Sequence, residues 1–429
     1  MPFEHPPATP KRIAVIGAGI SGLGAAHMLA GENRVTLFEA EDRLGGHART
    51  KLAGKRGDQP VDTGFIVFNY QNYPKLTKLF AELDVPVAES NMSFGASIRG
   101  GWLEYSMRSF SSIFAQRRNV LRPGYYDMLL DIMKFNRKAV ETARDPEMTL
   151  GELFEVLGLG RWFRDYYFLP ISGAIWSTPV EKMTEFPAQA LVRFFENHAL
   201  LQATGQRQWY TVQGGSIEYV RRLEAAIRAR GAEIRTAAPV ASVRRGPAGV
   251  TLRARGGVEE VFDEVIFATH SDVTLGMLAD ATPEERAALG AIRYQPNTAV
   301  LHADESFMPE RRGCWASWVY KADEETTGGD RIPLTYWMNS LQPIPKDDPL
   351  FVTLNPQREV RDDLVHDVTS FDHPVYDRAA LRAQGELRAL QGQNRSWFCG
   401  AYMKNGFHED GLASAVDVVE AMRRQAAWA

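Results

Sequence analysis

The sequence has few cysteines, no long apolar run and no large excess of either charge. Cys314 and Cys399 are its only cysteines among 429 residues, and they lie far apart in no metal-ligand spacing. This argues against a disulfide framework and fits a reducing cytoplasm. No stretch reaches the ~18 to 20 uninterrupted apolar residues that span a bilayer. The formal net charge of −4 gives no general attraction to nucleic acid.

We therefore expect a cytoplasmic protein that is either soluble or lies on the inner face of the cytoplasmic membrane. We expect neither a nucleic acid partner nor a bound metal. The length of the chain and its 45% of hydrophobic residues allow a large core and indicate two or more domains.

A glycine pattern near the N-terminus predicts a nucleotide-binding unit. Arg12 to Ile16 is an apolar run of strand type, and Leu23 to Leu29 continues with a helical pattern. Between them, Gly17, Gly19 and Gly22 supply the spacing G-x-G-x-x-G. The first glycine permits a sharp turn, the second lets backbone amides approach a pyrophosphate, and the third allows close packing of helix on strand.

The neighbouring residues indicate which nucleotide this unit binds. A second strand, Arg34 to Phe38, ends at Glu39, about 20 residues after the glycines, where a carboxylate can accept hydrogen bonds from a ribose 2′-OH. Glu39 therefore favours FAD or NAD over NADP. We also expect Ser21, just before the third glycine, to contact the cofactor.

The continuation of this unit resembles the E-x-x-x-R-x-G-G-R-x-x-T pattern of the flavin-containing amine oxidase and phytoene desaturase superfamily. The matching residues are Arg43, Gly45, Gly46 and Thr50. In that superfamily the segment wraps the FAD pyrophosphate, so the resemblance implies FAD as the cofactor. His47 stands in place of the usual second arginine, which leaves less fixed positive charge near the phosphates. Whether Arg49 compensates stays open.

Further segments follow the superfamily's order. Gly64 lies in a D-x-G turn where the superfamily's chain leaves the FAD domain beside the flavin, and Val240 matches a valine whose backbone contacts the adenine. Near the C-terminus, a strand followed by Gly400 resembles the second FAD motif. The resemblance implies a helix there whose N-terminus points at the flavin pyrimidine ring, where its dipole stabilises the anionic reduced flavin.

The second motif departs from the superfamily at one position. The usual G-D is Gly400-Ala401 here, so a carboxylate for the ribityl or phosphate oxygens has to come from elsewhere. Glu409 and Asp410 are the candidates. We expect Leu412, in the same helix, to lie beside the cofactor.

Because the two FAD motifs lie at opposite ends of the chain, we predict an α/β fold with a discontinuous Rossmann-type FAD-binding domain. We assign to it residues 1–72, 209–285 and 391–429. Residues 73–208 and 286–390 are expected to form a mixed-sheet and helical substrate domain, with a helical, membrane-facing part at about 106–205. Proline and aspartate are frequent between Gln342 and Asp377, which predicts exposed loops there.

Residues 106–138 are strongly basic and have apolar residues at helical spacing. The segment has two acidic residues, Asp127 and Asp131. Its seven cations are Arg108, Arg117, Arg118, Arg122, Lys134, Arg137 and Lys138. One interpretation is a solvated basic face on a helix that packs in the core. The other is a patch that docks on anionic lipid headgroups, where each cation contributes about 1 kcal/mol.

Residues 162–210 are dense in aromatic side chains. Most such rings belong to cores, but the same cluster would suit a wide apolar cavity for a hydrocarbon chain. Within it, residues 170–179 carry no charge, as in a segment buried against a ligand. The residues that we expect to contact substrate are Phe65, Trp176, Trp337 and Tyr402.

Finer matches at residues 62–69, 174–179, 336–339 and 406–411 resemble a bacterial set of FAD-binding proteins associated with cyclopropane-fatty-acid-synthase-like methyltransferases. The resemblance implies that a methylated long-chain fatty acyl group, phospholipid-bound, is desaturated on the way to furan fatty acids. It also makes a lipid methyltransferase a candidate partner. The flavin N5 would take a hydride and a base would take a proton.

Four residues of the C-terminal turn are candidates for that base, namely His408, Glu409, Tyr402 and Lys404. We prefer His408, whose unperturbed pKa lies near neutral, although the same residue could simply cap the helix or bind FAD. Two other functions stay open. One is a flavin amine oxidase, and the other is an FAD-dependent acyl or isoprenoid isomerase, or an acyl-lipid binding protein that keeps FAD as structure.

Overall fold

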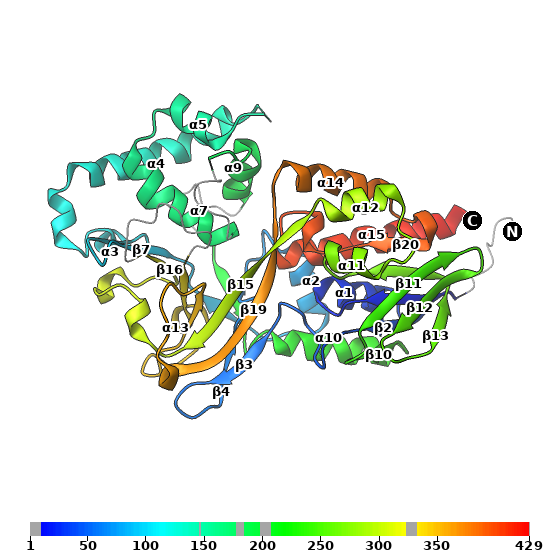
Figure 1. The fold of residues 1–429 in the computed structure, drawn as a ribbon. Coiled ribbons are helices and arrows are strands. Elements are labelled where there is room, and N and C mark those ends of the chain that lie inside the picture. The colour runs from blue at the N-terminus through cyan, green and yellow to red at the C-terminus, as the bar shows by residue number, and fades with distance from the viewer. Residues whose placement is uncertain (1–9, 146, 177–183, 198–206, 323–332, 429) are drawn as a thin grey trace, which may run out of the picture.

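The computed structural model of the protein describes residues 10–145, 147–176, 184–197, 207–322 and 333–428 (Figure 1). The first and last described residues belong to one lobe, which we call the Rossmann lobe. A mixed sheet, the sheet lobe, adjoins it, and a group of helices between residues 107 and 197, the helical lobe, lies beyond that sheet.

A five-stranded parallel sheet forms the centre of the Rossmann lobe, and its strands come from three separate parts of the chain. The strand order is β10 (Glu233–Arg235), β2 (Arg34–Phe38), β1 (Arg12–Ile16), β14 (Glu264–Phe267) and β20 (Ser396–Phe398). Strands β1 and β2 have the bounds that the sequence predicts. Because the strands are parallel, their carboxyl ends share one edge, where ligands of such sheets bind. We call it the cofactor edge.

Both faces of this sheet are covered. One face packs against α1 (Ile20–Leu29), α10 (Ile217–Ala229) and α15 (His408–Trp428). Side chains of β1 alternate accordingly, since Val15 belongs to this core and Ile16 to the opposite one. Helix α1 begins at Ile20, earlier than the Leu23 that the apolar pattern predicts, because Gly19 of the glycine turn is its N-cap.

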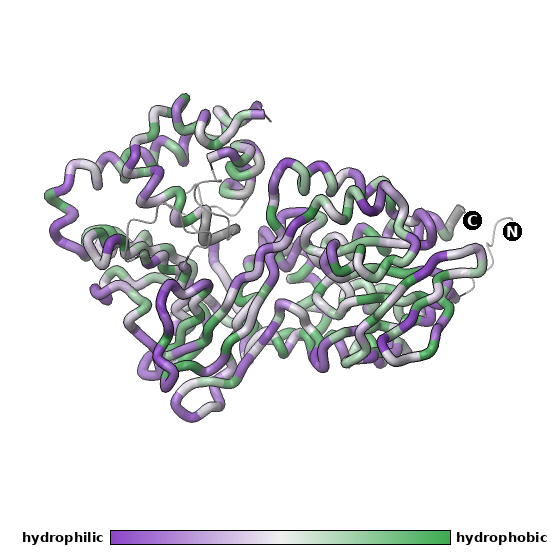
Figure 2. Tube along the Cα trace, in the orientation of Figure 1, coloured by the Kyte–Doolittle hydropathy of each residue, from purple (hydrophilic) through white to green (hydrophobic). Residues whose placement is uncertain are grey.

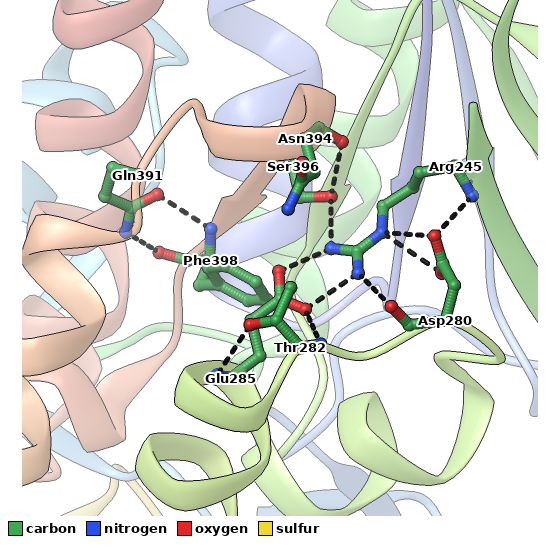
Figure 3. A network of polar contacts seen from close by, with 8 residues as sticks. All are labelled: Arg245, Asp280, Thr282, Glu285, Gln391, Asn394, Ser396 and Phe398. Atoms are coloured by element: carbon green, nitrogen blue, oxygen red, sulfur yellow. Dashed lines mark hydrogen bonds and ion pairs between the residues drawn. The ribbon is translucent and has the colours of Figure 1, made fainter. Parts of the chain in front are cut away.

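The opposite face packs against an antiparallel sheet and three helices. They are β11 (Val240–Gly246), β12 (Gly249–Ala254), β13 (Glu259–Phe262), α11 (Ser271–Met277), α12 (Pro283–Gly290) and α14 (Arg378–Ala389). Figure 3 shows the buried polar network that joins them. Nη2 of Arg245 on β11 donates to Glu285 of α12 at 2.7 Å, and its Nη1 donates to Ser396 Oγ on β20 at 3.2 Å. The network fixes the antiparallel sheet on the edge strand.

The sheet lobe contains a seven-stranded mixed sheet. Its order is β19 (Val365–Val375), β15 (Arg293–His302), β18 (Phe351–Leu354), β17 (Leu334–Trp337), β16 (Trp318–Ala322), β7 (Phe94–Ile98) and β8 (Leu103–Ser106). The long antiparallel pair β15 and β19 runs across the middle of the molecule toward the Rossmann lobe (Figure 1). The interval from Gln342 to Asp377 therefore includes two strands, and the loops that the sequence predicts there are confined to the residues before and between them.

Smaller elements lie between the two sheets. They are β3 (Thr50–Ala53), β4 (Gln59–Asp62), β5 (Val67–Phe68), α2 (Pro74–Glu82), β6 (Val87–Ser90), β9 (Trp209–Val212) and α13 (Met338–Leu341). Strand β9 pairs with both β5 and β6.

The helical lobe is built from short helices around one long one, and hydrophilic and hydrophobic residues alternate along them (Figure 2). Its elements are α3 (Phe110–Ile113), η1 (Arg117–Leu121), α4 (Pro123–Thr142), α5 (Leu150–Leu157), α6 (Arg161–Phe163), η2 (Arg164–Phe168), α7 (Leu169–Trp176) and α9 (Ala188–Asn197). The rings of Phe163, Phe168 and Phe195 surround Phe135 at centroid distances of 5.4, 5.2 and 6.1 Å. These aromatic residues form core, as most were expected to.

The predicted α/β class is confirmed by these sheets and helices. Both cysteines are buried and have free thiols. Among the described residues, no helix combines the length and the apolar character needed to cross a membrane.

Candidate functional site

The glycine turn between β1 and α1 is packed tightly everywhere except at Gly19. Gly17 has a φ of +98°, and its amide donates to the carbonyl of Phe38 at 2.8 Å. A Cβ at Gly22 would lie 1.8 Å from the Gly17 carbonyl oxygen, whereas a Cβ at Gly19 would have no heavy atom within 4 Å. The space in front of Gly19 is therefore free for a ligand, at a helix N-terminus that no side chain caps.

The segment with Gly45 and Gly46 lies against this turn. The amide of Gly45 donates to the carbonyl of Ala18 at 2.8 Å, and a Cβ at Gly46 would lie 3.1 Å from the Cα of Gly19. Arg43 is partly exposed nearby and pairs with Glu41 at 2.9 Å. The two glycines thus allow this segment to border the space in front of Gly19.

Arg49 does not replace the missing second arginine. Its guanidinium forms a two-pronged ion pair with Asp367 of β19, with one contact of 3.1 Å, and donates to Thr63 Oγ1 at 3.3 Å. It therefore fastens the Rossmann lobe to the sheet lobe. Because its guanidinium is engaged by Asp367 and Thr63, Arg49 does not supply the positive charge that the arginine missing at position 47 would bring to the phosphates.

Glu39 lies at the carboxyl end of β2, as predicted, and is partly exposed. Its Oε2 accepts from the amide of Ala18 at 2.7 Å and its Oε1 from that of Glu41 at 2.9 Å. Each oxygen keeps a further lone pair, so the carboxylate can still accept from ribose hydroxyls. The amide of Ala238 donates to the Glu39 carbonyl at 2.8 Å, which brings the start of β11, and hence Val240, to this end of the site.

Helices α1 and α15 begin side by side at the cofactor edge. A Cβ at Gly411 would lie 2.9 Å from both Ile20 and Ser21. A Cβ at Gly24 would lie only 2.6 Å from the side chain of Leu412. After β20, the amide of Gly400 donates to Ser414 Oγ at 2.9 Å. Two helix N-termini thus converge on the same edge. Ser21 and Leu412 serve this helix contact.

Tyr402 provides an unsatisfied polar group beside β20. Its side chain is 2% exposed, and among the described residues its hydroxyl has no hydrogen-bond partner. Burial raises the pKa of Tyr402 well above its usual value, so the hydroxyl is a proton donor. A buried donor of this kind requires an acceptor. This donor and the open space at Gly19 both fit a bound dinucleotide, which would be held by α1, Glu39 and the segment after β20.

Comparison with known proteins decides which dinucleotide this is. The family model described as flavin containing amine oxidoreductase matches residues 20–338. The chain belongs to that family. Its cofactor is FAD, as the resemblance implied.

Curated relatives of this chain match over short stretches. The L-amino-acid oxidase of Bungarus fasciatus is 51% identical over 51 residues, which cover 12% of this chain and 10% of that protein. The coproporphyrinogen III oxidase of Mycobacterium tuberculosis (strain ATCC 25618 / H37Rv) is 42% identical over 79 residues, or 18% and 17% of the two chains. The chain thus aligns with less than a fifth of either relative.

Solved structures match over nearly the whole chain and show the fold. A CLA-producing fatty acid isomerase from P. acnes has a TM-score of 0.68 at 14% identity, covering 96% of this chain and 98% of that one. Cyclohexylamine oxidase from Brevibacterium oxydans IH-35A has a TM-score of 0.69 at 14% identity, covering 97% and 100%.

The carboxylates expected to hold FAD bind backbone amides of the chain itself. Both oxygens of Glu409 accept from the amides of Lys75 and Leu76, each at 2.9 Å, and so cap helix α2. Asp410 accepts from the amide of Phe407 at 3.0 Å within its own turn. Glu409 therefore caps helix α2 and Asp410 caps its own turn. Their expected cofactor and catalytic roles stay predictions, since each carboxylate oxygen keeps a lone pair.

His408 is held between two aromatic residues. Its ring stacks on Phe65 with a centroid distance of 4.0 Å and an interplanar angle of 12°, and its Nε2 lies 2.6 Å from the hydroxyl of Tyr219. Burial lowers the pKa of His408 to about 3 and raises that of Tyr219 well above 10, so Tyr219 donates and Nε2 accepts. His408, the preferred base, is therefore unprotonated, but its Nε2 already accepts a hydrogen bond from Tyr219. This contact is what the sequence reasoning missed, because Tyr219 reads as an ordinary core residue of an amphipathic helix.

The remaining candidate base is also occupied. Nζ of Lys404 pairs with Asp417 at 2.9 Å on the partly exposed side of α15. Gly64, by contrast, lies as expected where the chain leaves the Rossmann lobe. A Cβ there would lie 2.0 Å from the carbonyl oxygen of His47, so the turn admits only glycine.

The aromatic residues of β17 face opposite sides of the sheet. Trp337 packs edge-to-face on Trp315 at 5.2 Å, whereas Tyr336 packs on Trp318 at 5.2 Å. The Tyr336 side shares a hydrophobic cluster with Met92 and Val67, which also contact the core of the Rossmann lobe. Tyr336 and Trp318 therefore face that lobe. Trp337, which was expected to contact substrate, lies on the other face of the sheet against Trp315, because neighbouring strand residues point to opposite faces. Its substrate contact stays a prediction. The side chain of Trp176 lies outside the described residues.

His47 belongs to a group of imidazoles near the cofactor edge. Its ring lies 5.9 Å from that of His270, which follows β14, and 5.7 Å from that of His373 on β19. Burial lowers the pKa of each, to about 4 for His373. The missing arginine is thus replaced by a neutral ring.

Asp62 fixes the connection after β4. It is fully buried and accepts from Thr50 Oγ1 at 2.6 Å, Ser216 Oγ at 2.7 Å and Gln342 Nε2 at 2.9 Å. Burial raises the pKa of Asp62 to about 6 in spite of these bonds. The carboxylate holds the start of α10, and with it Tyr219, against the sheet lobe.

Proposed function

We propose that this flavin-containing oxidoreductase desaturates a long-chain fatty acyl group, and that the chain is methylated and phospholipid-bound, as in furan fatty acid biosynthesis. The observation that carries the proposal is the uncharged character of the substrate side. We assign four uncharged side chains to that side. Phe65 stacks on neutral His408, and Trp318 packs on Tyr336 in a cluster that shares Val67 and Met92 with the Rossmann core.

The buried carboxylates near the cofactor edge support the same choice. Asp62, Glu409 and Asp410 are all occupied by donors of the chain itself. None offers a free oxygen to a cationic group, whereas an acyl chain needs only apolar surface and shape.

FAD supplies the hydride acceptor when it is bound. The chain's own residues hold it, since the N-terminus of α1 is free to bind its phosphates and Glu39 to bind its ribose. The buried Tyr402 hydroxyl, which has no acceptor among the described residues, would donate to the cofactor. The stacked rings of Phe65 and His408 form an uncharged wall. His408 can take a proton from substrate only if the Tyr219 hydroxyl turns away from Nε2.

The fatty-acid profile of a host tests this proposal. The host's membranes should contain methylated monounsaturated chains, and the profile is measured by mass spectrometry with and without the protein. We expect a new species lighter by two hydrogens, absent when Gly19→Val blocks the cofactor space. An unchanged profile in the presence of folded flavoprotein would overturn the acyl assignment.

Two alternatives keep specific support. The family model favours amine oxidation, which predicts that amines, and not lipids, bleach the flavin. An isomerase is compatible with the fold, because a fatty acid isomerase shares it. Isomerisation would give a product of unchanged mass with a moved double bond, so the same mass-spectrometric experiment separates it from desaturation.

A further inference from the structure

The end of the helical lobe exposes large apolar side chains to solvent. Phe110 of α3 is 80% exposed and Leu121 of η1 is 84% exposed, with Val120 beside it at 49%. These elements form the end of the molecule away from the Rossmann lobe (Figure 1). Side chains of this size rarely lie so open without a partner. We call this group the apolar tip.

Helix α4 continues the exposed surface. Tyr126, Leu130, Met133 and Val140 are all exposed, and their spacing places them along one face of the helix. The core-facing side is a different one, because Tyr125, Met128 and Phe135 are buried there. The helix therefore presents apolar residues on two sides, of which the lobe itself covers only one.

Cations surround this surface without being neutralised. Lys134 pairs with Asp131. The guanidinium carbon Cζ of Arg122 lies over the ring of Trp102, 4.3 Å from its centroid. The exposed cations that have no ion pair within the described part of the chain are Arg108, Arg117, Arg118, Arg137 and Lys138. Asp127 is the one exposed carboxylate between residues 106 and 138, all of which are described.

We propose that the apolar tip and the exposed face of α4 dock on a bilayer that contains anionic phospholipid. Bulky apolar side chains can enter the boundary between headgroups and acyl chains while arginine and lysine stay at headgroup level. The five free cations outnumber the two exposed carboxylates of this surface, Asp127 and Glu141, which matches a negatively charged partner. This inference goes beyond the proposed reaction and does not depend on it.

Vesicle co-sedimentation of the purified full-length protein tests the docking. Wild-type protein is mixed with vesicles of phosphatidylcholine alone or of phosphatidylcholine with phosphatidylglycerol. We expect binding to the anionic vesicles only, weakened by added salt. Phe110→Ser combined with Leu121→Ser removes the apolar tip and should weaken binding by roughly tenfold or more. Arg117→Glu combined with Arg118→Glu should lower the affinity for anionic vesicles roughly fivefold for each cation removed.

Matched controls use exposed residues far from the apolar tip. Val258→Ser removes a side chain that is 81% exposed on the Rossmann lobe, and Arg286→Glu with Arg382→Glu makes the same change of net charge on α12 and α14. Both should bind vesicles like wild type. Because every substituted side chain is exposed, the circular dichroism and melting temperature should not change.

Three results would overturn the proposal. One is equal binding by wild type and both tip variants, and another is binding that does not depend on anionic lipid. The third is a dimer in light scattering that the tip variants convert to monomer while no vesicle binding is seen, since the surface would then join two copies of the chain.

Discussion

The hydroxyl of Tyr219 and Nε2 of His408 lie 2.6 Å apart, which ties the first residue of α15 to the first turn of α10. The two helices come from distant parts of the chain. Phe65 stacks on the same imidazole, so three segments meet in one contact.

Removing the Tyr219 hydroxyl tests this contact. Tyr219→Phe leaves a buried imidazole nitrogen without its donor, and we expect a loss of about 1–3 kcal/mol of unfolding free energy. His408→Phe keeps a ring on Phe65, and the double variant should lose less than the sum of the single losses. Urea unfolding of the four proteins measures the coupling. Strict additivity would contradict a direct bond.

The kcat of Tyr219→Phe tests separately whether His408 is the catalytic base. If His408 accepts the substrate proton, freeing Nε2 should maintain or raise kcat, while His408→Phe should lower it strongly. If His408 only positions neighbouring groups, both variants should change kcat by a similar, small factor. Single-turnover flavin reduction distinguishes the two outcomes.

Two glycines of the same turn should respond differently to a side chain. The Cβ that Gly19→Val adds meets no atom within 4 Å, and φ at this residue is an ordinary −72°. The fold should therefore persist while FAD affinity falls by more than about tenfold, because the side chain displaces the cofactor. Gly22→Val would collide with the Gly17 carbonyl and should prevent folding. Flavin absorbance per protein and circular dichroism measure the two effects. Full flavin content in Gly19→Val would place the pyrophosphate elsewhere.

Stability should fall in acid because histidines are buried unprotonated. Burial lowers the pKa of His302 to about 4, and its Nε2 lies 2.7 Å from Thr353 Oγ1. The unfolded chain binds the proton near pH 6.5, so between pH 6.5 and 4 the unfolded state holds more protons and stability declines as the pH falls. The contribution of this residue is about 3 kcal/mol.

The variant His302→Gln isolates that contribution, since glutamine does not titrate. Urea unfolding from pH 7 to pH 4 should show a smaller decline in the variant than in wild type. Parallel curves would show that His302 is not buried as a neutral ring.

The Arg245–Glu285 ion pair should be costly to break. The two side chains are 3% and 1% exposed (Figure 3). Arg245→Met leaves a buried carboxylate without its main partner, and we expect a loss of about 3–5 kcal/mol. The matched control is Arg293→Met, whose partner Asp377 lies on an open surface, with an expected loss of about 0–1 kcal/mol. Equal losses in thermal or urea unfolding would contradict the burial of this pair.

The cofactor half of the molecule could be predicted from sequence because its signals are local. Gly17, Gly19 and Gly22 have a fixed spacing between a strand and a helix, and Glu39 follows at the expected distance. The structure places these residues at one edge, and FAD is confirmed as the cofactor by the family. Backbone requirements of this kind can be met by few residue types, so they are visible in a single sequence.

The substrate and catalytic residues could not be predicted in the same way, because the direction of a side chain depends on how it packs. Trp337 and Tyr336 differ by one position in β17, and only sheet register decides which faces the Rossmann lobe. Glu409 looks free in sequence, yet helix α2 takes both of its oxygens. Strand β19 escaped notice because its exposed side carries His366, Val368, Ser370 and Asp372, so that no clean alternation of apolar and polar residues marks it.

The most direct test of the account is anaerobic flavin reduction. FAD-loaded protein is mixed, without oxygen, with vesicles that contain a methylated monounsaturated phospholipid, and in parallel with simple primary amines. The account predicts that the lipid bleaches the visible flavin absorbance and that an acyl species lighter by two hydrogens forms in equal amount. Bleaching by the amines with no response to the lipid would contradict it.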